Sequence, residues 1–185
     1  MAEKMAQSKR TAAHITTVAD VDMTELVTLR EKILSVIEEK AKLKITYTPF
    51  IIKAVAKALQ EYPIVNSSLV EDKIVVKKYC NIGVAMARQE GGLIVPVIHH
   101  AERMNLIEIA QKLEELNEKA KTGKITLEDI RGGTFTITNV GMMGVILNTP
   151  IINPPESAVL GVGAIVKKPV VMDDQIVIRH RMYLS

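Results

Sequence analysis

The apolar residues of this chain change their spacing several times along the sequence, and this change limits the possible folds. Between residues 26 and 37 they recur at every third or fourth position, as in an amphipathic helix. Between residues 134 and 140, and again between 175 and 185, they alternate with other residues, as in a strand. No repeat or low-complexity linker interrupts the succession. The sequence therefore predicts one mixed α/β domain.

The core of such a domain has to be built mainly from branched aliphatic side chains. The sequence has no Trp and two Phe, although 48% of its residues are hydrophobic. Because Ile and Val suit the pleated surface of a sheet, this composition favours β-rich or mixed structure.

Local signals set the expected boundaries of the elements. A short helix is expected at residues 3–10, and a longer one after a capping box formed by Asp22 and Glu25. A third helix is expected to begin at Thr48-Pro49 and to end just before Pro63. A fourth is expected to begin at a second capping box, Asn105 and Glu108, and to end at Gly123, with a further helical turn at 126–130. Strands are expected at 14–22, on both sides of a turn at 71–72, at 81–88 and 93–98 around a hairpin loop at 89–92, and at 134–140, 158–166 and 175–185.

Charge and hydropathy exclude several classes of protein. Lys and Arg total 24 and Asp and Glu total 21, with basic and acidic residues interspersed, so we expect no nucleic-acid partner. The longest apolar stretches, such as residues 93–98, are far too short to span a membrane, and the N-terminus lacks the apolar core of a signal peptide. We expect a cytoplasmic protein, or one of the mitochondrial matrix if the source is eukaryotic.

The histidines and the single cysteine are weak candidates for catalysis. No carboxylate stands at a spacing that would orient His14, His99, His100 or His180, and no pair has the spacing of a zinc site, so surface or strand-end positions are expected. Cys80 begins an apolar segment, and a buried inert thiol is favoured over an activated nucleophile. One cysteine can form no internal disulfide and no metal cluster. No metal site is predicted.

The glycine pair in Gly161-Val162-Gly163 has the start of a dinucleotide-binding fingerprint. The third glycine is missing, and Lys167-Lys168-Pro169 follows where a helix would have to begin under a phosphate. We interpret these glycines as positions in a strand that another backbone segment approaches closely.

Residues 132–144 form the segment that is most informative about function. Thr134, Thr136 and Thr138 share one face of the expected strand, which ends at a loop bracketed by glycines. Such an arrangement can present a hydroxyl to a ligand or an oxyanion. By pattern alone, the threonines can equally cover a solvent-facing sheet surface.

Several motifs in a fixed order resemble one family, and they cover about residues 5–185. They are found at positions 8 and 13–16, 21–26 with Arg30, 47–59 with 62–67, 81–85 with 92–98, 132–141 and 150–163, the last two being the most specific. The sequence resembles the catalytic domain of the 2-oxo acid dehydrogenase acyltransferases, which are the dihydrolipoamide acyltransferase components of those complexes.

The resemblance implies a chloramphenicol acetyltransferase-like two-layer fold, a mixed β-sheet with helices packed on it, in trimers with active sites between subunits. It also implies acyl transfer between coenzyme A and the lipoyl-lysine of a separate domain, with no cofactor bound covalently to this chain. A threonine in the position of Thr138 would hydrogen-bond the oxyanion. Arg30 and Asn139 are the candidate contacts for coenzyme A.

One family motif has no counterpart. The catalytic histidine of the family, in Asp-His-Arg-x-x-Asp-Gly, would begin a few residues beyond Ser185. The strand pattern also continues with a period of two up to Leu184. We therefore expect residues 1–185 to be a single catalytic domain without its C-terminal segment and without lipoyl or peripheral subunit-binding domains. We expect this fragment to be inactive alone.

Two alternatives follow because the catalytic histidine motif has no counterpart among residues 1–185. The chain could be a non-catalytic trimeric scaffold of such a complex. A free-standing acetyltransferase of the chloramphenicol type is less favoured, because that enzyme also needs its histidine. No motif specifies the acyl group or an assembly larger than a trimer.

Overall fold

The computed structural model describes residues 2–88 and 91–185 of the chain. Its described residues belong to two compact units, each built from separate stretches of sequence. The first unit comprises Met1–His14, Thr46–Thr138 and Ile151–Val159, and the second comprises Ile15–Ile45, Asn139–Pro150 and Leu160–Ser185. Each unit is built from both helices and strands, as the alternating pattern predicted.

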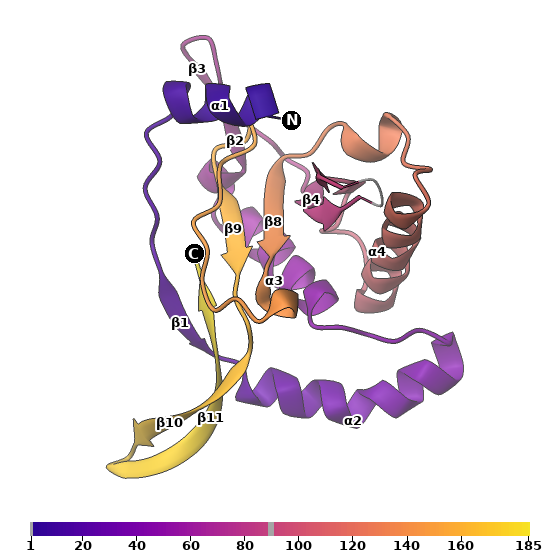
Figure 1. Cartoon of the computed structure of the whole chain (residues 1–185), viewed down its shortest axis with the longest axis vertical. Helices are drawn as coiled ribbons and strands as arrows, with labels where there is room; N and C mark the ends of the chain where they lie inside the picture. Colours follow the sequence, from indigo (N-terminus) through magenta and orange to yellow (C-terminus); the bar gives the residue numbers. More distant parts are fainter. Residues whose placement is uncertain (1, 89–90) are drawn as a thin grey trace. The chain divides into compact units, whose positions relative to one another are not determined.

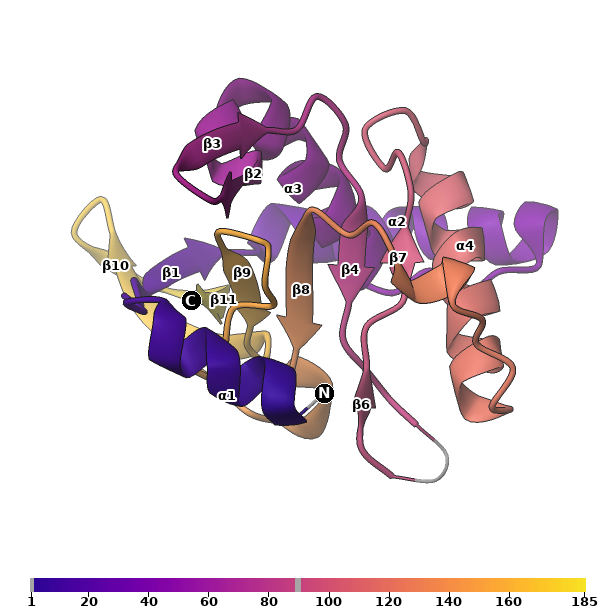
Figure 2. The same ribbon diagram turned by 90° about the horizontal axis from the view of Figure 1, so that it is seen from above.

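Strand β4 (Ile82–Val84) is the central strand of the first unit (Figure 2). It pairs antiparallel with β7 (Val97–Ile98) and parallel with β8 (Phe135–Asn139). Gly83 lies opposite Val97 on one side and opposite Thr136 on the other. The sheet is therefore mixed, as predicted.

Helices and short hairpins complete the first unit. They are α1 (Ala2–Thr11), α3 (Thr48–Glu61), α4 (Leu106–Lys121), the 3₁₀ turns η1 (Pro63–Asn66) and η2 (Glu128–Ile130), and the strand pairs β2–β3 (Ser67–Val70, Lys73–Val76) and β5–β6 (Met86–Ala87, Leu93–Ile94). The predicted hairpin loop at 89–92 lies partly outside the described residues, which exclude 89–90. On its far side Gly91 and Gly92 have φ of +83° and +85°.

The second unit contains a long two-stranded ribbon, drawn in yellow in Figure 1. It is formed by β10 (Val166–Met172) and β11 (Gln175–Leu184), joined at Asp173-Asp174, where both residues have positive φ. Strand β11 also pairs with β1 (Ala19–Asp22) and β9 (Val159–Val162). The remaining elements are α2 (Thr24–Ala41) and η3 (Gly141–Met143).

Aliphatic side chains form the core, as the composition predicted. In the first unit the side chains with no exposed surface include Ile52, Ile82, Ile98, Ile109, Leu116 and Ile137. Removing such apolar area from water stabilises the fold by about 25 cal/mol for each Å².

Several predicted boundaries were right and others were wrong; the strand expected at 158–166 ends at Val162, and β10 (Val166–Met172) was not predicted. The capping box of α4 is present: Asn105 Oδ1 accepts from the backbone N–H groups of Ile107 and Glu108, and Glu108 Oε2 accepts from that of Asn105. The box predicted at Asp22 is absent, because the N-cap of α2 is Met23 and makes no side-chain capping bond. The strand expected at 14–22 forms only at Ala19–Asp22, where β11 supplies a partner.

The glycine interpretation in the second unit is confirmed in part: Gly161 lies in β9 but side chains of Ser185 and Asn148 occupy the space beside it, and Gly163, one residue after β9, is the one that another backbone approaches. A Cβ added to Gly163 would collide with the carbonyl group of Ile146 and lie 3.1 Å from the carbonyl oxygen of Tyr183. The backbone of another segment therefore occupies the space that a side chain would need.

Candidate active site

The hydroxyl row lies on β8, and two of its three members are buried. Thr134 and Thr136 are each 4% exposed, so the alternative of a solvent-facing threonine surface is wrong for both. The Thr134 hydroxyl holds β8 to the start of β4: Asn81 N–H donates to its oxygen at 3.2 Å, and it donates to the Asn81 carbonyl at 3.3 Å. These contacts fix the strand that carries Thr138.

Thr138 lies one residue before the end of β8 and is half-buried. Within the described residues of the first unit, no hydrogen bond engages its hydroxyl. A threonine hydroxyl has one donor and two acceptor sites, so this group can donate to a developing oxyanion. Its catalytic role remains a prediction.

Asn139 shapes the loop that follows. Its Oδ1 accepts a hydrogen bond from the backbone N–H of Gly141 at 3.0 Å, forming an Asx turn. The loop then reaches β9, where Val140 N–H donates to the Val162 carbonyl at 3.0 Å. A Cβ at Gly141 would lie 2.6 Å from the carbonyl carbon of Gly163, so only glycine fits there. Asn139 therefore has a structural function, and its contact with coenzyme A remains a prediction.

Arg30 projects from α2 in the second unit. Its Nε donates to the carbonyl oxygen of Ile45 at 2.8 Å, which ties the helix to the end of the following loop. Guanidinium groups pair well with phosphates, and this bond gives Arg30 a defined orientation. Binding of coenzyme A by Arg30 remains a prediction.

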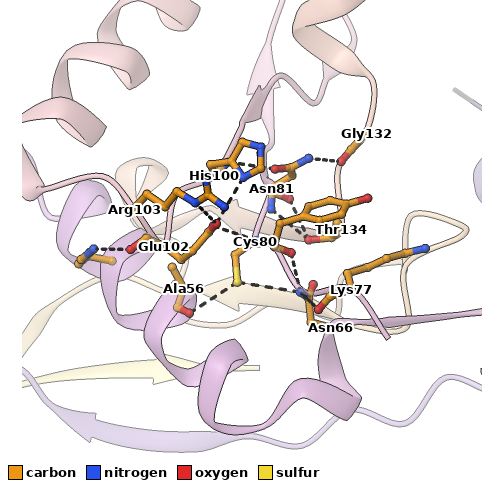
Figure 3. Close-up of polar contacts among 12 residues, drawn as sticks. Ala56, Asn66, Lys77, Cys80, Asn81, His100, Glu102, Arg103, Gly132 and Thr134 are labelled. Carbon is orange, nitrogen blue, oxygen red and sulfur yellow. Dashed lines mark hydrogen bonds and ion pairs between the residues drawn. The ribbon is translucent and has the colours of Figure 1, made fainter. Parts of the chain in front are cut away.

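Cys80 and His100 lie in a polar network of the first unit (Figure 3). Cys80 is 2% exposed, and its burial, together with the nearby Glu102 carboxylate, raises the pKa of the thiol. The prediction that the thiol is buried is thus confirmed, and its inertness stays a prediction, which the raised pKa favours because only the thiolate is a good nucleophile.

The expectation that no carboxylate orients a histidine is wrong for His100. Its Nδ1 lies 3.3 Å from Glu102 Oε1, and Glu102 Oε2 also accepts from the backbone N–H of Cys80 at 2.9 Å. Burial would raise the pKa of Glu102, but the hydrogen bonds from the backbone N–H groups of Cys80 and Glu102 and from His100 lower it overall. Since Lys53 Nζ donates to the Glu102 and Met104 carbonyls, this network holds α3 to the loop after β7.

Pattern reasoning missed Glu156 as a buried ionisable group. Its side chain lies in the first unit, is 7% exposed, and accepts a hydrogen bond from Asn153 Nδ2 at 2.9 Å through Oε1. Burial raises the pKa of this carboxyl. The family motif at residues 150–163 includes Glu156, but no local pattern in the sequence marks this residue as buried.

Residues 2–88 and 91–185 contain neither a cluster of metal-ligand side chains nor a membrane-spanning helix. Nowhere in these ranges do three His, Cys, Asp or Glu side chains gather as metal ligands would. None of the described helices is both long enough and apolar enough to cross a membrane.

Comparison with known proteins places these features in context. A family model described as 2-oxoacid dehydrogenases acyltransferase (catalytic domain) matches residues 1–185. The dihydrolipoyllysine-residue succinyltransferase component of the 2-oxoglutarate dehydrogenase complex of Haemophilus influenzae is 40% identical over 185 residues, which are all of this chain and 45% of that protein. The dihydrolipoyllysine-residue acetyltransferase component of the pyruvate dehydrogenase complex of Staphylococcus epidermidis is 42% identical over 187 residues, covering all of this chain and 43% of that protein. The chain thus spans less than half the length of these curated relatives.

Solved structures agree with this result. A probable dihydrolipoamide acetyltransferase from Listeria monocytogenes has a TM-score of 0.95 and 39% identity, covering 99% of this chain and 78% of its own. The cubic core of the pyruvate dehydrogenase multienzyme complex has a TM-score of 0.95 and 35% identity over 99% of this chain and 75% of its own. Chloramphenicol acetyltransferase, at 11% identity and a TM-score of 0.54 over 98% of this chain and 83% of its own, shares the fold alone.

The family resemblance and the chloramphenicol acetyltransferase-like fold expected from the motifs are both confirmed. The chain belongs to the family of 2-oxoacid dehydrogenase acyltransferase catalytic domains.

Proposed function

We propose that this chain is the acyltransferase core of a protein that moves an acyl group between coenzyme A and dihydrolipoamide on a lipoyl-lysine arm. The observation that carries the proposal is the half-buried Thr138 hydroxyl, held on a strand fixed by buried contacts in a chain of this family. The names of the relatives, which are transferase components, favour this function over the non-catalytic scaffold.

The reaction joins a thiol to the carbonyl carbon of a thioester. A base removes the thiol proton, the sulfur attacks the carbonyl carbon, and its oxygen becomes an oxyanion that accepts a hydrogen bond from Thr138. Collapse of this intermediate expels the other sulfur as a thiolate, which takes up a proton. One oxyanion donor is worth about 10²–10³ in kcat.

The base itself is not assigned to any residue of this chain. In the proposal it is the histidine of the family motif, which has no match among residues 1–185. We propose that residues 1–185 form one catalytic domain that works with this motif, and that the lipoyl group belongs to a separate domain. Arg30 and Asn139 are the proposed contacts for coenzyme A.

The assembly is proposed to be a homotrimer that builds a larger cage, with active sites between subunits. The similarity of this chain to the cubic core of a pyruvate dehydrogenase complex supports this arrangement. The relatives include both succinyl and acetyl transferases at 40–42% identity, so the proposal covers both acyl groups. We propose the cytoplasm, or the mitochondrial matrix of a eukaryotic source, as its location.

The test is a transfer assay with the full-length protein that contains this chain. Purified protein is given acetyl-CoA or succinyl-CoA with dihydrolipoamide, and formation of free coenzyme A and of acyl-dihydrolipoamide is measured. Turnover that depends on both substrates supports the proposal. Hydrolysis of the thioester without acyl transfer, or no reaction with either acyl group, contradicts it.

A further inference from the structure

The ribbon of the second unit, formed by β10 and β11, has a distal half that reaches beyond its neighbouring strands (Figure 1). Strand β1 pairs with β11 at residues 181–184, and β9 pairs with it at Leu184. Within the described part of the chain, residues 175–180 of β11 pair with β10 alone. Both faces of this distal half are therefore free of further strands of the sheet.

One face of the distal half is apolar. Directly opposed residues of antiparallel strands lie on the same face, as do alternate residues of one strand. Val171 lies opposite Ile176, and Pro169 lies opposite Ile178, so these four side chains share a face. Val171, Ile176 and Ile178 are 72%, 78% and 72% exposed. Single exposed apolar residues are common, whereas a contiguous group marks an interaction site.

The opposite face of the ribbon is covered by contacts within the second unit. Lys168 Nζ lies 4.1 Å from the centroid of the Tyr183 ring. Arg179 Nε lies 3.5 Å from Asp22 Oδ2 and 3.0 Å from Met172 Sδ. The long side chains of this face thus have partners in their own chain, and the apolar face is the one that is open to another molecule.

The outer edge of β10 is a poor place for a further strand. In the described residues β10 pairs with β11 only, so its other edge is open. Pro169 has no backbone N–H to donate to an added strand, and Lys167 and Lys168 place charge beside it. A partner is therefore expected to cover the apolar face rather than to extend the sheet.

The two ends of the apolar face differ in charge. The tip is the turn Asp173-Asp174, and the base carries Lys167, which lies opposite His180. Measured from the middle of the apolar group, at residue 170, Lys167 and Asp173 are each three residues away, or about 10 Å. A rotation of 180° about an axis across this middle therefore brings the acidic tip of one copy to Lys167 of another. The face is complementary to itself in both charge and hydrophobicity.

We propose that the apolar face of the ribbon binds the same face of a second copy of this chain across a two-fold axis, with the two ribbons antiparallel. Ile178 then lies over Ile176 of the partner subunit, and Lys167 lies beside Asp173 of the partner subunit. Such a contact is isologous and closes after two copies. The inference goes beyond the proposed homotrimer, whose subunits meet through unlike surfaces, and it supplies a contact that joins trimers into a larger cage.

The first test is sedimentation velocity of the full-length protein that contains this chain, over a range of concentrations. Ile176→Lys and Ile178→Lys each place a charge in the middle of the apolar contact, so each should raise the dissociation constant for the joining of trimers by about 30-fold or more. Gln175→Lys is the matched control, because it adds the same charge at an exposed position on the opposite face. Its dissociation constant should stay within about threefold, and circular dichroism checks that all variants are folded.

A second test examines the charges at the two ends. Lys167→Gln and the double variant Asp173→Asn/Asp174→Asn should each weaken the association about twofold to fivefold. Asn also tolerates the positive φ of both turn residues. Combining all three substitutions should cost no more than the worse of the two, since both remove the same ion pairs. Within one chain Lys167 and Asp173 are about 20 Å apart, twice the Debye length in 0.1 M salt, so additive effects would contradict the antiparallel contact.

Cross-linking tests the register of the two copies. Chains with Ile176→Cys are mixed with chains with Ile178→Cys and treated with a short bis-maleimide. Covalent dimers should form in the mixture and much less in either sample alone, because the two-fold axis places residue 176 over residue 178. The unchanged protein, whose buried Cys80 is the single native thiol, gives the background. Equal yields in the mixture and in the separate samples would overturn this register.

The sizes of the particles separate this inference from the proposed function, because none of these measurements uses acyl transfer. Ile176→Lys should convert larger particles into trimers. Conversion into monomers would assign the ribbon to the three-fold contact, and an unchanged particle size would assign its face to another molecule; either result overturns the inference. An unchanged protein with no particle larger than a trimer does so too. A dimer that Ile176→Lys converts into monomers would keep the two-fold contact and remove the proposed trimer.

Discussion

Ser8 donates a hydrogen bond of 2.7 Å from its Oγ to the carbonyl oxygen of Ile152, 144 residues further along the chain. Ser8 has no exposed surface. The bond joins the N-terminal helix α1 to the segment that carries Glu156. Helix α1 is therefore part of the support of the first unit.

Replacement of Ser8 by Ala should destabilise the protein by about 1–3 kcal/mol, because the Ile152 carbonyl loses a buried partner. Denaturant unfolding measures this loss as a lower midpoint with an unchanged slope. Thr11→Ala is the matched control, since the Thr11 hydroxyl bonds the Gln7 carbonyl on an exposed face of the same helix. Equal effects of the two substitutions would show that the link to Ile152 contributes no stability.

Replacement of Thr138 by Ala should lower kcat about 10²-fold with little change in KM, because the oxyanion exists only during the reaction. Thr138→Ser keeps the hydroxyl and should retain most activity. Thr136→Ala removes a hydroxyl from the same face at another position and should cost less than Thr138→Ala. Steady-state kinetics of the full-length protein decide the matter: equally mild losses at both positions would remove Thr138 from the mechanism.

Replacement of Arg30 by Ala should raise KM for coenzyme A much more than KM for dihydrolipoamide, because a guanidinium group pairs with phosphate and dihydrolipoamide has none. Arg10→Ala, at an exposed arginine of α1, should change neither constant. Circular dichroism checks that loss of the Ile45 contact leaves the fold intact. An unchanged KM for coenzyme A in a folded Arg30→Ala variant contradicts the assignment.

Residues 1–185 alone should transfer no acetyl group from acetyl-CoA to dihydrolipoamide above background. The reason is that no residue among them matches the histidine motif of the family, so only the oxyanion donor and the binding surfaces contribute. The assay compares this polypeptide with the full-length protein under the same conditions. Turnover by the isolated polypeptide would mean that another group serves as the base.

Asp129 should contribute stability that disappears at low pH. A hydrogen bond from the Thr126 backbone N–H is the main cause that lowers the pKa of Asp129 to about 2, with help from the Lys119 ammonium and the Thr126 hydroxyl. Because the folded-state pKa lies below the ordinary value of 3.8, the contribution is present above about pH 4 and is lost as the pH falls to about 2.

The variant Asp129→Asn should therefore be less stable than the unchanged protein at pH 7, by about 1–2 kcal/mol. The difference should shrink as the pH is lowered from 4 towards 2. Urea unfolding at several pH values measures it, with the exposed neighbour Glu128→Gln as the control. A difference that stays constant over this range would mean that the charge of Asp129 is not responsible.

Sequence patterns alone specified the elements whose signals lie within a few residues of one another. The capping box of Asn105 and Glu108, the end of α4 before Gly123, and the turn at Asp173-Asp174 all form as predicted. Each depends on the backbone conformation of adjacent residues and on short hydrogen bonds. The motifs also identified the family, because their order spans the whole chain.

Tertiary structure decided the features that depend on distant segments. The start of α2 shifted to Met23 and Thr24 because His180 bonds both: its carbonyl accepts from Met23 N–H, and its N–H donates to the Thr24 hydroxyl. The alternation at 134–140 assigned the threonines to one face but could not say whether that face is covered, and in the structure Thr134 and Thr136 are buried. Periodicity follows from the local backbone, whereas burial, and with it the direction in which the pKa of a carboxyl group moves, follows from whichever segment packs against it.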